Sequence, residues 1–146
     1  MPLWKIYHPV GVFSREDKQG LSEAITAIYA RNLPKFYVGV VFQEVAADSF
    51  FIGGEPTGDF VRIWVDHIAR TMPTPEIRAK FIEMVDAVLA PYVRDRGLRW
   101  EYHIDETSYE LWSIHGYRPP LPGTEDEKRW RAENRPSPVG PREVTA

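Results

Sequence analysis

The first half of the chain places a helix-like segment between two strand-like ones. Residues 3–8 alternate in polarity as a half-buried strand does, and residues 37–45 form an apolar, β-branched and aromatic run of strand length. Residues 14–17 match a capping box, which opens a helix. The apolar face of this helix recurs at helical spacing, at Leu21, Ala24, Ile25, Ile28 and Tyr29. We therefore predict a strand, a helix that ends near residues 32–34, and a second strand.

The second half repeats this order. Residues 61–67 and 98–105 alternate as strands, and Thr74 and Pro75 suit the N-cap and the first position of a helix. Because a proline removes a hydrogen bond and clashes with the preceding turn, Pro91 predicts a kink or an early end near Ala90. The apolar face of this second helix comprises Ile77, Phe81, Met84, Val85, Val88, Leu89 and Tyr92.

These two halves predict a duplicated β-α-β fold of the α/β (α+β) class. The two helix caps, Ser14 and Thr74, lie about sixty positions apart, and each strand-helix-strand unit implies parallel pairing with a right-handed crossover. Two units give a four-stranded sheet with both helices on one face. We expect the other face to be exposed and rich in aromatic and aliphatic groups, so that oligomerisation would cover it.

Domain boundaries follow from the repeat and from a change of character after Trp112. The first unit covers about residues 2–58, with a short edge strand at 50–52 and a turn at 53–58, and the second covers about 59–118. Together they predict one domain over residues 1–118. Residues 119–146 form a proline-rich, charged C-terminal extension, in which we expect one short polar helix within 124–134 and disorder over the last ten or so residues.

Composition excludes several classes of protein. The 146 residues include no cysteine, which excludes disulfides, thiol catalysis and cysteine-ligated zinc, and no apolar run is long enough to span a bilayer. The net charge of −3 comes from mixed signs with no basic stripe, so nucleic acid is not an expected partner. No signal peptide is recognisable at the start, which favours a cytoplasmic location.

Pro2 is the main candidate for chemistry. A small residue after Met1 favours removal of the methionine, which would leave Pro2 with a free secondary amine held at the head of a strand. An α-amino group titrates near pH ~7.7–8.0, so it can serve as a general base or acid near neutrality. Many proteins begin Met-Pro without any catalytic meaning, so the start of the chain alone does not settle its use.

The Met-Pro start, the duplicated β-α-β units and the absence of cysteine together resemble the tautomerase superfamily. Within it, the chain is similar to the cis-3-chloroacrylic acid dehalogenase group over roughly residues 2–123. The local matches are Pro2 and its strand, 24–26, 41–44, 51–54, Arg70, 100–102 and 116–123. The resemblance implies a β-α-β repeat assembled as a homotrimer, a small carboxylate substrate and no cofactor.

The resemblance also implies roles for individual residues. Pro2 matches the catalytic proline, which acts as a base in tautomerases and as a proton donor in the dehalogenases. Arg70 matches an arginine that binds the substrate carboxylate, as the bidentate guanidinium fork allows. Tyr102 matches a tyrosine that helps to position or protonate the substrate, and Tyr29 replaces a histidine that helps to hold the carboxylate and is expected to shape the pocket.

Two departures from the group weaken the expectation of dehalogenation. Pro73 stands where a second arginine is expected, and Ile114, or the neighbouring His115, stands where a water-activating glutamate is expected. Glu106 and Glu110 could replace that carboxylate, although each suits a solvated loop. Without such a base, addition of water across a multiple bond has no evident catalyst, whereas proton transfer by an amine needs only Pro2 and an anion holder.

Three functions therefore remain open. The first is a tautomerase that uses the Pro2 amine on a small enol or 2-keto carboxylic acid, and the second is a cis-3-haloacrylate dehalogenase or hydratase. The third is a non-catalytic trimeric binding protein of the same fold. No metal site is expected, because the scattered histidines His67, His103 and His115 show no ligand spacing and more often pack or face water.

Overall fold

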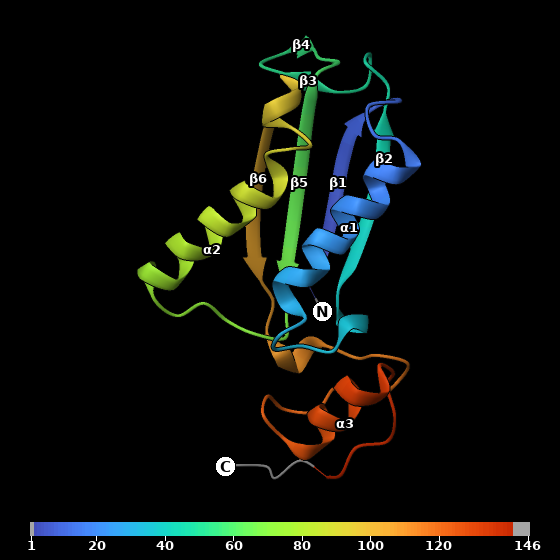
Figure 1. The fold of residues 1–146 in the computed structure, drawn as a ribbon, viewed down its shortest axis with the longest axis vertical. Coiled ribbons are helices and arrows are strands. Elements are labelled where there is room, and N and C mark those ends of the chain that lie inside the picture. The colour runs from blue at the N-terminus through green and yellow to red at the C-terminus, as the bar shows by residue number, and fades with distance from the viewer. Residues whose placement is uncertain (1, 142–146) are drawn as a thin grey trace.

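The computed structural model describes residues 2–141, which form a four-stranded sheet, a small hairpin and three α-helices (Figure 1). No helix within these residues is both long and apolar enough to cross a membrane. The elements in chain order are β1 (Leu3–Pro9), α1 (Arg15–Tyr29), β2 (Gly39–Val45), β3 (Phe51–Ile52), β4 (Glu55–Pro56), β5 (Phe60–His67), α2 (Pro75–Leu89), β6 (Arg99–Glu106) and α3 (Glu125–Glu133).

The main sheet has the strand order β2-β1-β5-β6. β1 pairs in parallel with β2, and β5 pairs in parallel with β6, whereas the central pair β1 and β5 is antiparallel. Figure 1 shows α1 and α2 crossing the same face of the sheet. The predicted fold, two β-α-β units with both helices on one face, is confirmed.

The helix boundaries follow from capping residues and a proline that can be recognised in the sequence. In the capping box of α1, the Asp17 amide donates to Ser14 Oγ at 3.0 Å and the Ser14 amide donates to Asp17 Oδ2 at 2.9 Å. The Thr74 side chain caps α2, and α2 ends at Leu89, two residues before Pro91. The prediction of an early end near Ala90 is therefore confirmed.

Two predicted strand boundaries differ from the structure. The second strand was expected from residue 37, but Lys35–Tyr37 forms a 3₁₀ turn and β2 starts at Gly39. Tyr37 is fully buried and packs edge-on against Trp112 at 4.8 Å between ring centroids, so tertiary packing takes this aromatic residue out of the strand. The turn expected over residues 53–58 also contains β4, which pairs with β3.

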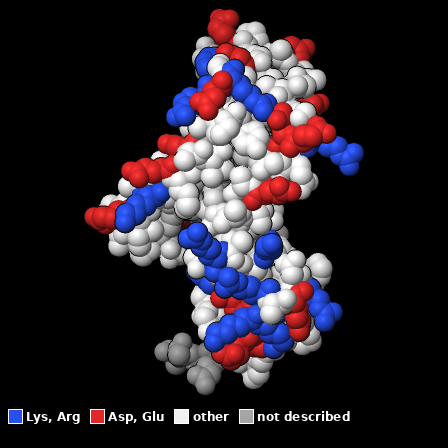
Figure 2. Space-filling view, viewed as in Figure 1, with Lys and Arg blue, Asp and Glu red and all other residues white. Residues whose placement is uncertain are grey.

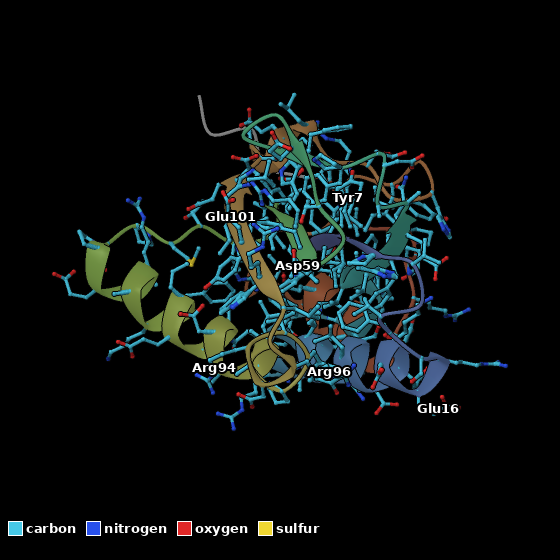
Figure 3. All side chains as sticks on the ribbon, turned by 90° about the horizontal axis from the view of Figure 1, so that it is seen from above. Tyr7, Glu16, Asp59, Arg94, Arg96 and Glu101 are labelled. Carbon is cyan, nitrogen blue, oxygen red and sulfur yellow. The ribbon has the colours of Figure 1, made fainter. Side chains whose placement is uncertain are left out.

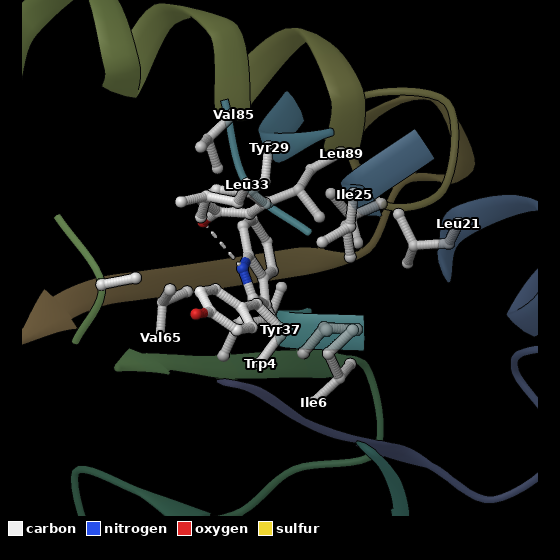
Figure 4. Packing of buried hydrophobic residues seen from close by; sticks show 14 of the residues in the cluster. Trp4, Ile6, Leu21, Ile25, Tyr29, Leu33, Tyr37, Val65, Val85 and Leu89 are labelled. Atoms are coloured by element: carbon white, nitrogen blue, oxygen red, sulfur yellow. Dashed lines mark hydrogen bonds between the residues drawn. The ribbon is translucent and has the colours of Figure 1, made fainter. Parts of the chain in front are cut away.

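The core lies between the sheet and the two helices (Figure 4). Alternate residues of β1 and β5 point into it, and Leu21, Ile25 and Tyr29 of α1 cover them. The apolar face predicted for α2 is only half buried: Val85 and Leu89 are enclosed, whereas Ile77 is 45% exposed and Met84 41%. The reason is visible in Figure 1, where the N-terminal half of α2 projects beyond the sheet.

The helix-free face of the sheet is more polar than we expected from the sequence. Tyr7 and Glu101 lie on this face, on the side away from the helices (Figure 3). Lys5 places its ammonium 5.0 Å from the ring of Trp64, and Trp64 Nε1 donates to Asp105 Oδ2 at 2.8 Å. Apolar groups are exposed on this face as expected, such as Val41, 48% exposed, and Trp64, 42% exposed, but charged residues of β5 and β6 lie among them.

The C-terminal extension packs onto the end of the sheet from which β1 starts (Figure 1). The short helix expected within residues 124–134 is present as α3, and Trp130 on it is fully buried. Beyond α3, Trp130 Nε1 donates to the Ser137 carbonyl at 3.0 Å and the Gly140 amide donates to Asp126 Oδ2 at 3.0 Å. Residues 137–140 are thus tied to α3 instead of disordered, and residues 142–146 lie outside the described part.

Replacing Trp130 by alanine is expected to lower the free energy of unfolding by about 3–5 kcal/mol. The indole is 0% exposed and lies among Phe36, Tyr37 and Tyr117, so its removal leaves a cavity where the extension meets the core. Urea unfolding measures the change. Lys128→Ala on the same helix removes an exposed side chain and should change stability by less than about 0.5 kcal/mol. Equal effects of the two variants would contradict this packing role.

Candidate functional site

One pocket, of about 200 Å³, lies at the end of the sheet where β1 begins and both α1 and β5 end. These three ends meet because β1 and β5 are antiparallel and α1 returns across the sheet after β1. Half of the described lining is polar or comes from proline, namely Pro2, Tyr29, Asn32, His67 and Arg70. The other half is apolar, namely Ile28, Leu33, Met72, Phe81 and Met84.

Pro2 is buried and fixed at the head of β1. Its carbonyl accepts a hydrogen bond from the Gly39 amide at 2.9 Å, immediately before Leu3 pairs with Gly39 in the sheet. The residue is therefore anchored by the β1–β2 ladder and lines the pocket. The predicted removal of Met1 concerns a residue outside the described part of the chain.

Arg70 reaches the pocket from the segment after β5 and is held by the extension. Its Nη2 donates to Glu127 Oε1 at 2.8 Å and to the Asn32 carbonyl at 3.3 Å, and its Nη1 donates to the Ala69 carbonyl at 2.8 Å. The Arg70 side chain is 34% exposed, whereas that of Glu127 is only 8% exposed. Glu127 Oε1 also accepts from the Gly123 amide at 3.1 Å, so α3 fixes both the carboxylate and the guanidinium.

Tyr29 and His67 form a hydrogen-bonded pair at the wall of the pocket. Tyr29 Oη lies 2.6 Å from His67 Nε2, and Trp4 Nε1 donates to the same oxygen at 3.1 Å (Figure 4). Burial raises the pKa of the Tyr29 hydroxyl above its usual range, so the hydroxyl keeps its proton. Burial, with a smaller contribution from the positive charge of the N-terminus, lowers the pKa of His67 to about 4.

The charge of the pocket is small and positive. Arg70 is the one permanently charged residue among the described lining residues, and none of those residues is Asp or Glu. Over the face shown in Figure 2, Lys and Arg side chains are interspersed with Asp and Glu. The pocket therefore offers one guanidinium, three of whose five N–H donors are already engaged, beside an apolar wall. This arrangement suits a small anion with an apolar substituent.

The structure brings together three of the four site residues that the sequence suggested. Pro2, Tyr29 and Arg70 line one pocket, whereas Tyr102 does not line it. Tyr102 lies in the middle of β6, where its hydroxyl donates to Asp86 Oδ1 at 2.6 Å and to the Ile82 carbonyl at 3.2 Å. Burial, and then this bond to a carboxylate, raise the pKa of Tyr102.

Of the carboxylates and histidines weighed as alternatives, His67 lines the pocket, whereas Glu106, Glu110 and His115 do not. Glu106 accepts from the Met72 amide in a neighbouring surface groove, which shares Met72 with the pocket, and Glu110 and His115 are exposed. Ile114 is half-buried and forms a bridge with Tyr117. Within residues 2–141, no group of three or more His, Cys, Asp or Glu side chains is arranged to hold a metal ion.

Sequence reasoning missed two residues of this region, His67 and Glu127. His67 was considered as a metal ligand or as a residue that packs or faces water, but not as a pocket residue. The sequence does carry a signal for its burial, because His67 continues the inward-pointing positions Val61, Ile63 and Val65 of β5. Glu127 sits in a helix whose composition is almost wholly polar. Nothing in the local pattern distinguishes it from its exposed neighbours, because its burial depends on contacts with Arg70 and Gly123.

Lowering the pH from 7 to 4 is expected to destabilise the protein through His67. The unfolded histidine binds a proton near pH 6.5, whereas the folded one does so only near pH 4, so the unfolded state gains protons first. The two pKa values correspond to about 3 kcal/mol of unfolding free energy, present at pH 7 and lost toward pH 4. Urea unfolding at several pH values, with wild type and His67→Asn, measures it.

The comparison isolates His67 because His8, whose pKa burial also lowers, is present in both proteins. His67→Asn should show a shallower loss of stability than wild type between pH 6.5 and 4. Parallel curves for the two proteins would show that His67 is not the residue that opposes protonation.

Residues 1–135 match a protein family described as "Putative oxalocrotonate tautomerase enzyme". Native RhCC from Rhodococcus jostii RHA1 is 46% identical, with a TM-score of 0.91, over 94% of this chain and 99% of that chain. A protein described as a probable enzyme from the thermophilic fungus Aspergillus fumigatus is 42% identical, with a TM-score of 0.90, over 95% of this chain and 98% of that chain. No curated protein matches the chain.

Two further structures are similar at low identity and show the fold alone. N1, described as a member of the cis-3-chloroacrylic acid dehalogenase family, is 18% identical with a TM-score of 0.69, over 90% of this chain and 97% of that chain. A fused 4-OT described as an asymmetric trimer is 22% identical with a TM-score of 0.59, over 79% of this chain and 94% of that chain.

Proposed function

This chain belongs to the oxalocrotonate tautomerase family, within the tautomerase superfamily, and we propose that its Pro2 amine catalyses proton transfer on a small enol or 2-keto carboxylic acid. The observation that carries the proposal is that Pro2 and Arg70 line the same pocket. An amine that can exchange a proton near neutral pH and a guanidinium that can hold a carboxylate are the two groups this reaction needs.

In the proposed reaction, Arg70 binds the carboxylate of the substrate and so orients its carbon atoms toward Pro2. Acting on the keto form, the neutral amine takes a proton from C3, and the electron pair of that C–H bond moves to leave an enolate. The protonated amine then delivers the proton to oxygen, and the reverse sequence converts enol to keto. The mechanism requires removal of Met1, because an amide nitrogen does not accept a proton near neutrality.

The pocket favours proton transfer over addition of water. Adding water across a double bond needs a group that activates the water, usually a carboxylate, and the described lining contains none. The apolar side chains Phe81, Met72 and Leu33 lie on the same pocket as the single arginine. We therefore propose a monoanionic 2-keto acid with an apolar substituent as the substrate class, with dehalogenation as the alternative.

A homotrimer is part of the proposal. The fused 4-OT of the same fold is described as a trimer, and here the free face of the sheet and the projecting half of α2 are open to a neighbour. Trp64, on the sheet face, is 42% exposed, and Ile82 on α2 is 41% exposed. Association would cover these groups, and sedimentation or light scattering at several concentrations measures it.

The direct test is the decay of the enol form of phenylpyruvate, followed by ultraviolet absorbance. Wild type is expected to accelerate the conversion to the keto form, and cis-3-chloroacrylate is expected to release no chloride. Intact-mass analysis of the same sample establishes whether Met1 is absent. No acceleration on this and related enol acids, in a sample that has lost Met1, would favour the non-catalytic binding protein instead.

A further inference from the structure

His67 has an unusual environment for a histidine that no assigned role uses. It is 6% exposed, its Nε2 lies 2.6 Å from Tyr29 Oη, and it lines the pocket together with Pro2 and Arg70. Its ring forms no other hydrogen bond to residues 2–141. Because Nε2 faces Tyr29 and the ring lines the pocket, Nδ1 is the ring nitrogen that remains for a ligand in the pocket.

The neighbours of His67 determine which ring nitrogen carries the hydrogen. An indole N–H can only donate, so Tyr29 Oη accepts from Trp4 at 3.1 Å and its own hydrogen is left to point elsewhere. At 2.6 Å the evident acceptor for that hydrogen is His67 Nε2. Nε2 therefore carries no hydrogen in the neutral ring, and the hydrogen is on Nδ1. Burial, which opposes a charge on His67, supports the neutral form.

We propose that His67 is a catalytic residue of this pocket, a neutral imidazole whose Nδ1–H donates a hydrogen bond to the substrate oxygen that becomes negative. The inference rests on the proposed function of Pro2. As the amine takes the proton from C3, the C–H electron pair forms the C2–C3 double bond and the carbonyl electrons move to oxygen. His67 stabilises that oxygen without transferring its hydrogen, so the proton count of the reaction is unchanged.

The Tyr29–Trp4 pair gives this donor its fixed orientation. Without the Tyr29 hydroxyl, the ring could place its hydrogen on either nitrogen, and only one tautomer would donate into the pocket. Tyr29 is therefore a positioning residue that acts through His67. A neutral donor also adds no second positive charge beside Arg70, which agrees with a substrate that carries a single carboxylate.

Steady-state kinetics with the enol of phenylpyruvate can distinguish whether His67 acts as a hydrogen-bond donor or only as a packing residue. His67→Phe keeps the ring volume but lacks the donor, and is expected to lower kcat by about 100-fold with little change in KM. His67→Asn places an amide N–H at the Nδ1 position and should recover at least tenfold of that loss. His115→Asn, in an exposed loop, is the matched control and should behave as wild type. A His67→Phe variant with kcat within twofold of wild type overturns the inference.

A second measurement does not depend on turnover or on the folding of a variant. Nitrogen-15 NMR of histidine-labelled wild type at pH 7 is expected to show a neutral His67 ring protonated at Nδ1, and oxalate, a mimic of an enolate carboxylate, should shift that nitrogen. Pro2→Ala should show the same shift, so failure of the Pro2 mechanism leaves this result intact. A charged ring, an Nε2–H tautomer or an Nδ1 indifferent to oxalate would each contradict the proposal.

Discussion

Pro2→Ala is expected to lower kcat/KM for an enol acid by about 100-fold or more. The substitution replaces a secondary amine at the head of β1 with a more mobile primary one, and positioned acid–base catalysis contributes about 10²–10⁴-fold. The backbone bond from the Gly39 amide to the carbonyl of residue 2 remains possible, so the fold should persist. Steady-state kinetics, with intact-mass confirmation that Met1 is absent, measures the effect.

Pro9→Ala is the matched control. Pro9 ends β1, the strand that Pro2 immediately precedes, and does not line the pocket. Pro9→Ala removes the same type of side chain at the other end of this strand and should leave kcat/KM unchanged within about twofold. Equal losses in the two variants would mean that proline in β1 matters for folding, and an active Pro2→Ala would remove Pro2 from the chemistry.

Arg70→Gln is expected to lower kcat/KM by about 100-fold, mainly through a higher KM. A charge-assisted bond to a carboxylate contributes about 1.5–3 kcal/mol, and the guanidinium fork can form two such bonds. The single variant also removes the ion-pair partner of Glu127, whose side chain is 8% exposed and whose Oε2 has no partner in the described residues. The kinetic test therefore uses Arg70→Gln in the background of Glu127→Gln.

The double variant separates substrate binding from stability. Leaving a buried charge unpaired costs about 3–5 kcal/mol, and Glu127→Gln removes that charge while keeping an acceptor for the Gly123 amide. Arg94→Gln changes an exposed arginine whose ion pair within residues 2–141 is with Asp95, and should retain wild-type kinetics. A wild-type KM in a folded double variant would show that Arg70 does not hold the carboxylate.

Most of the fold was predictable because its signals are local. Strand alternation, the Ser14 and Thr74 caps and the break before Pro91 each depend on a few neighbouring residues. The errors came from long-range packing. Tyr37 leaves the strand to lie against Trp112, and the N-terminal half of α2 projects beyond the sheet that its apolar face was expected to cover.

The pocket was predictable in part, for a topological reason. When β1 and β5 are antiparallel neighbours, the start of β1, the end of α1 and the end of β5 lie at the same end of the sheet. Pro2, Tyr29 and Arg70 follow from these three positions and therefore lie near one another. Tyr102 belongs to the middle of β6 and bonds to α2 instead. The role of Glu127 could not be predicted from the sequence, because its contact with Arg70 joins positions 57 residues apart and Glu127 lies on a helix of polar composition.

The role of the C-terminal extension was the feature that the sequence predicted least well. Its composition, rich in proline and charge, is typical of a solvated tail, and a single tryptophan does not distinguish a buried helix from an exposed one. In the structure, Trp130 fills a space among Phe36, Tyr37 and Tyr117, and the same helix brings Glu127 to Arg70. The extension thus completes both the core and the surroundings of Arg70.

The central claim, an activated Pro2 amine beside an anion-binding arginine, is tested most directly by covalent labelling. Wild type is treated with a 3-halopropiolate, a carboxylate that alkylates reactive amines, and analysed by intact mass and peptide mapping. We predict loss of Met1, a single adduct on Pro2, and slower labelling both with phenylpyruvate present and in the Arg70→Gln, Glu127→Gln variant. A retained Met1, or a free Pro2 that stays unlabelled, would contradict the account.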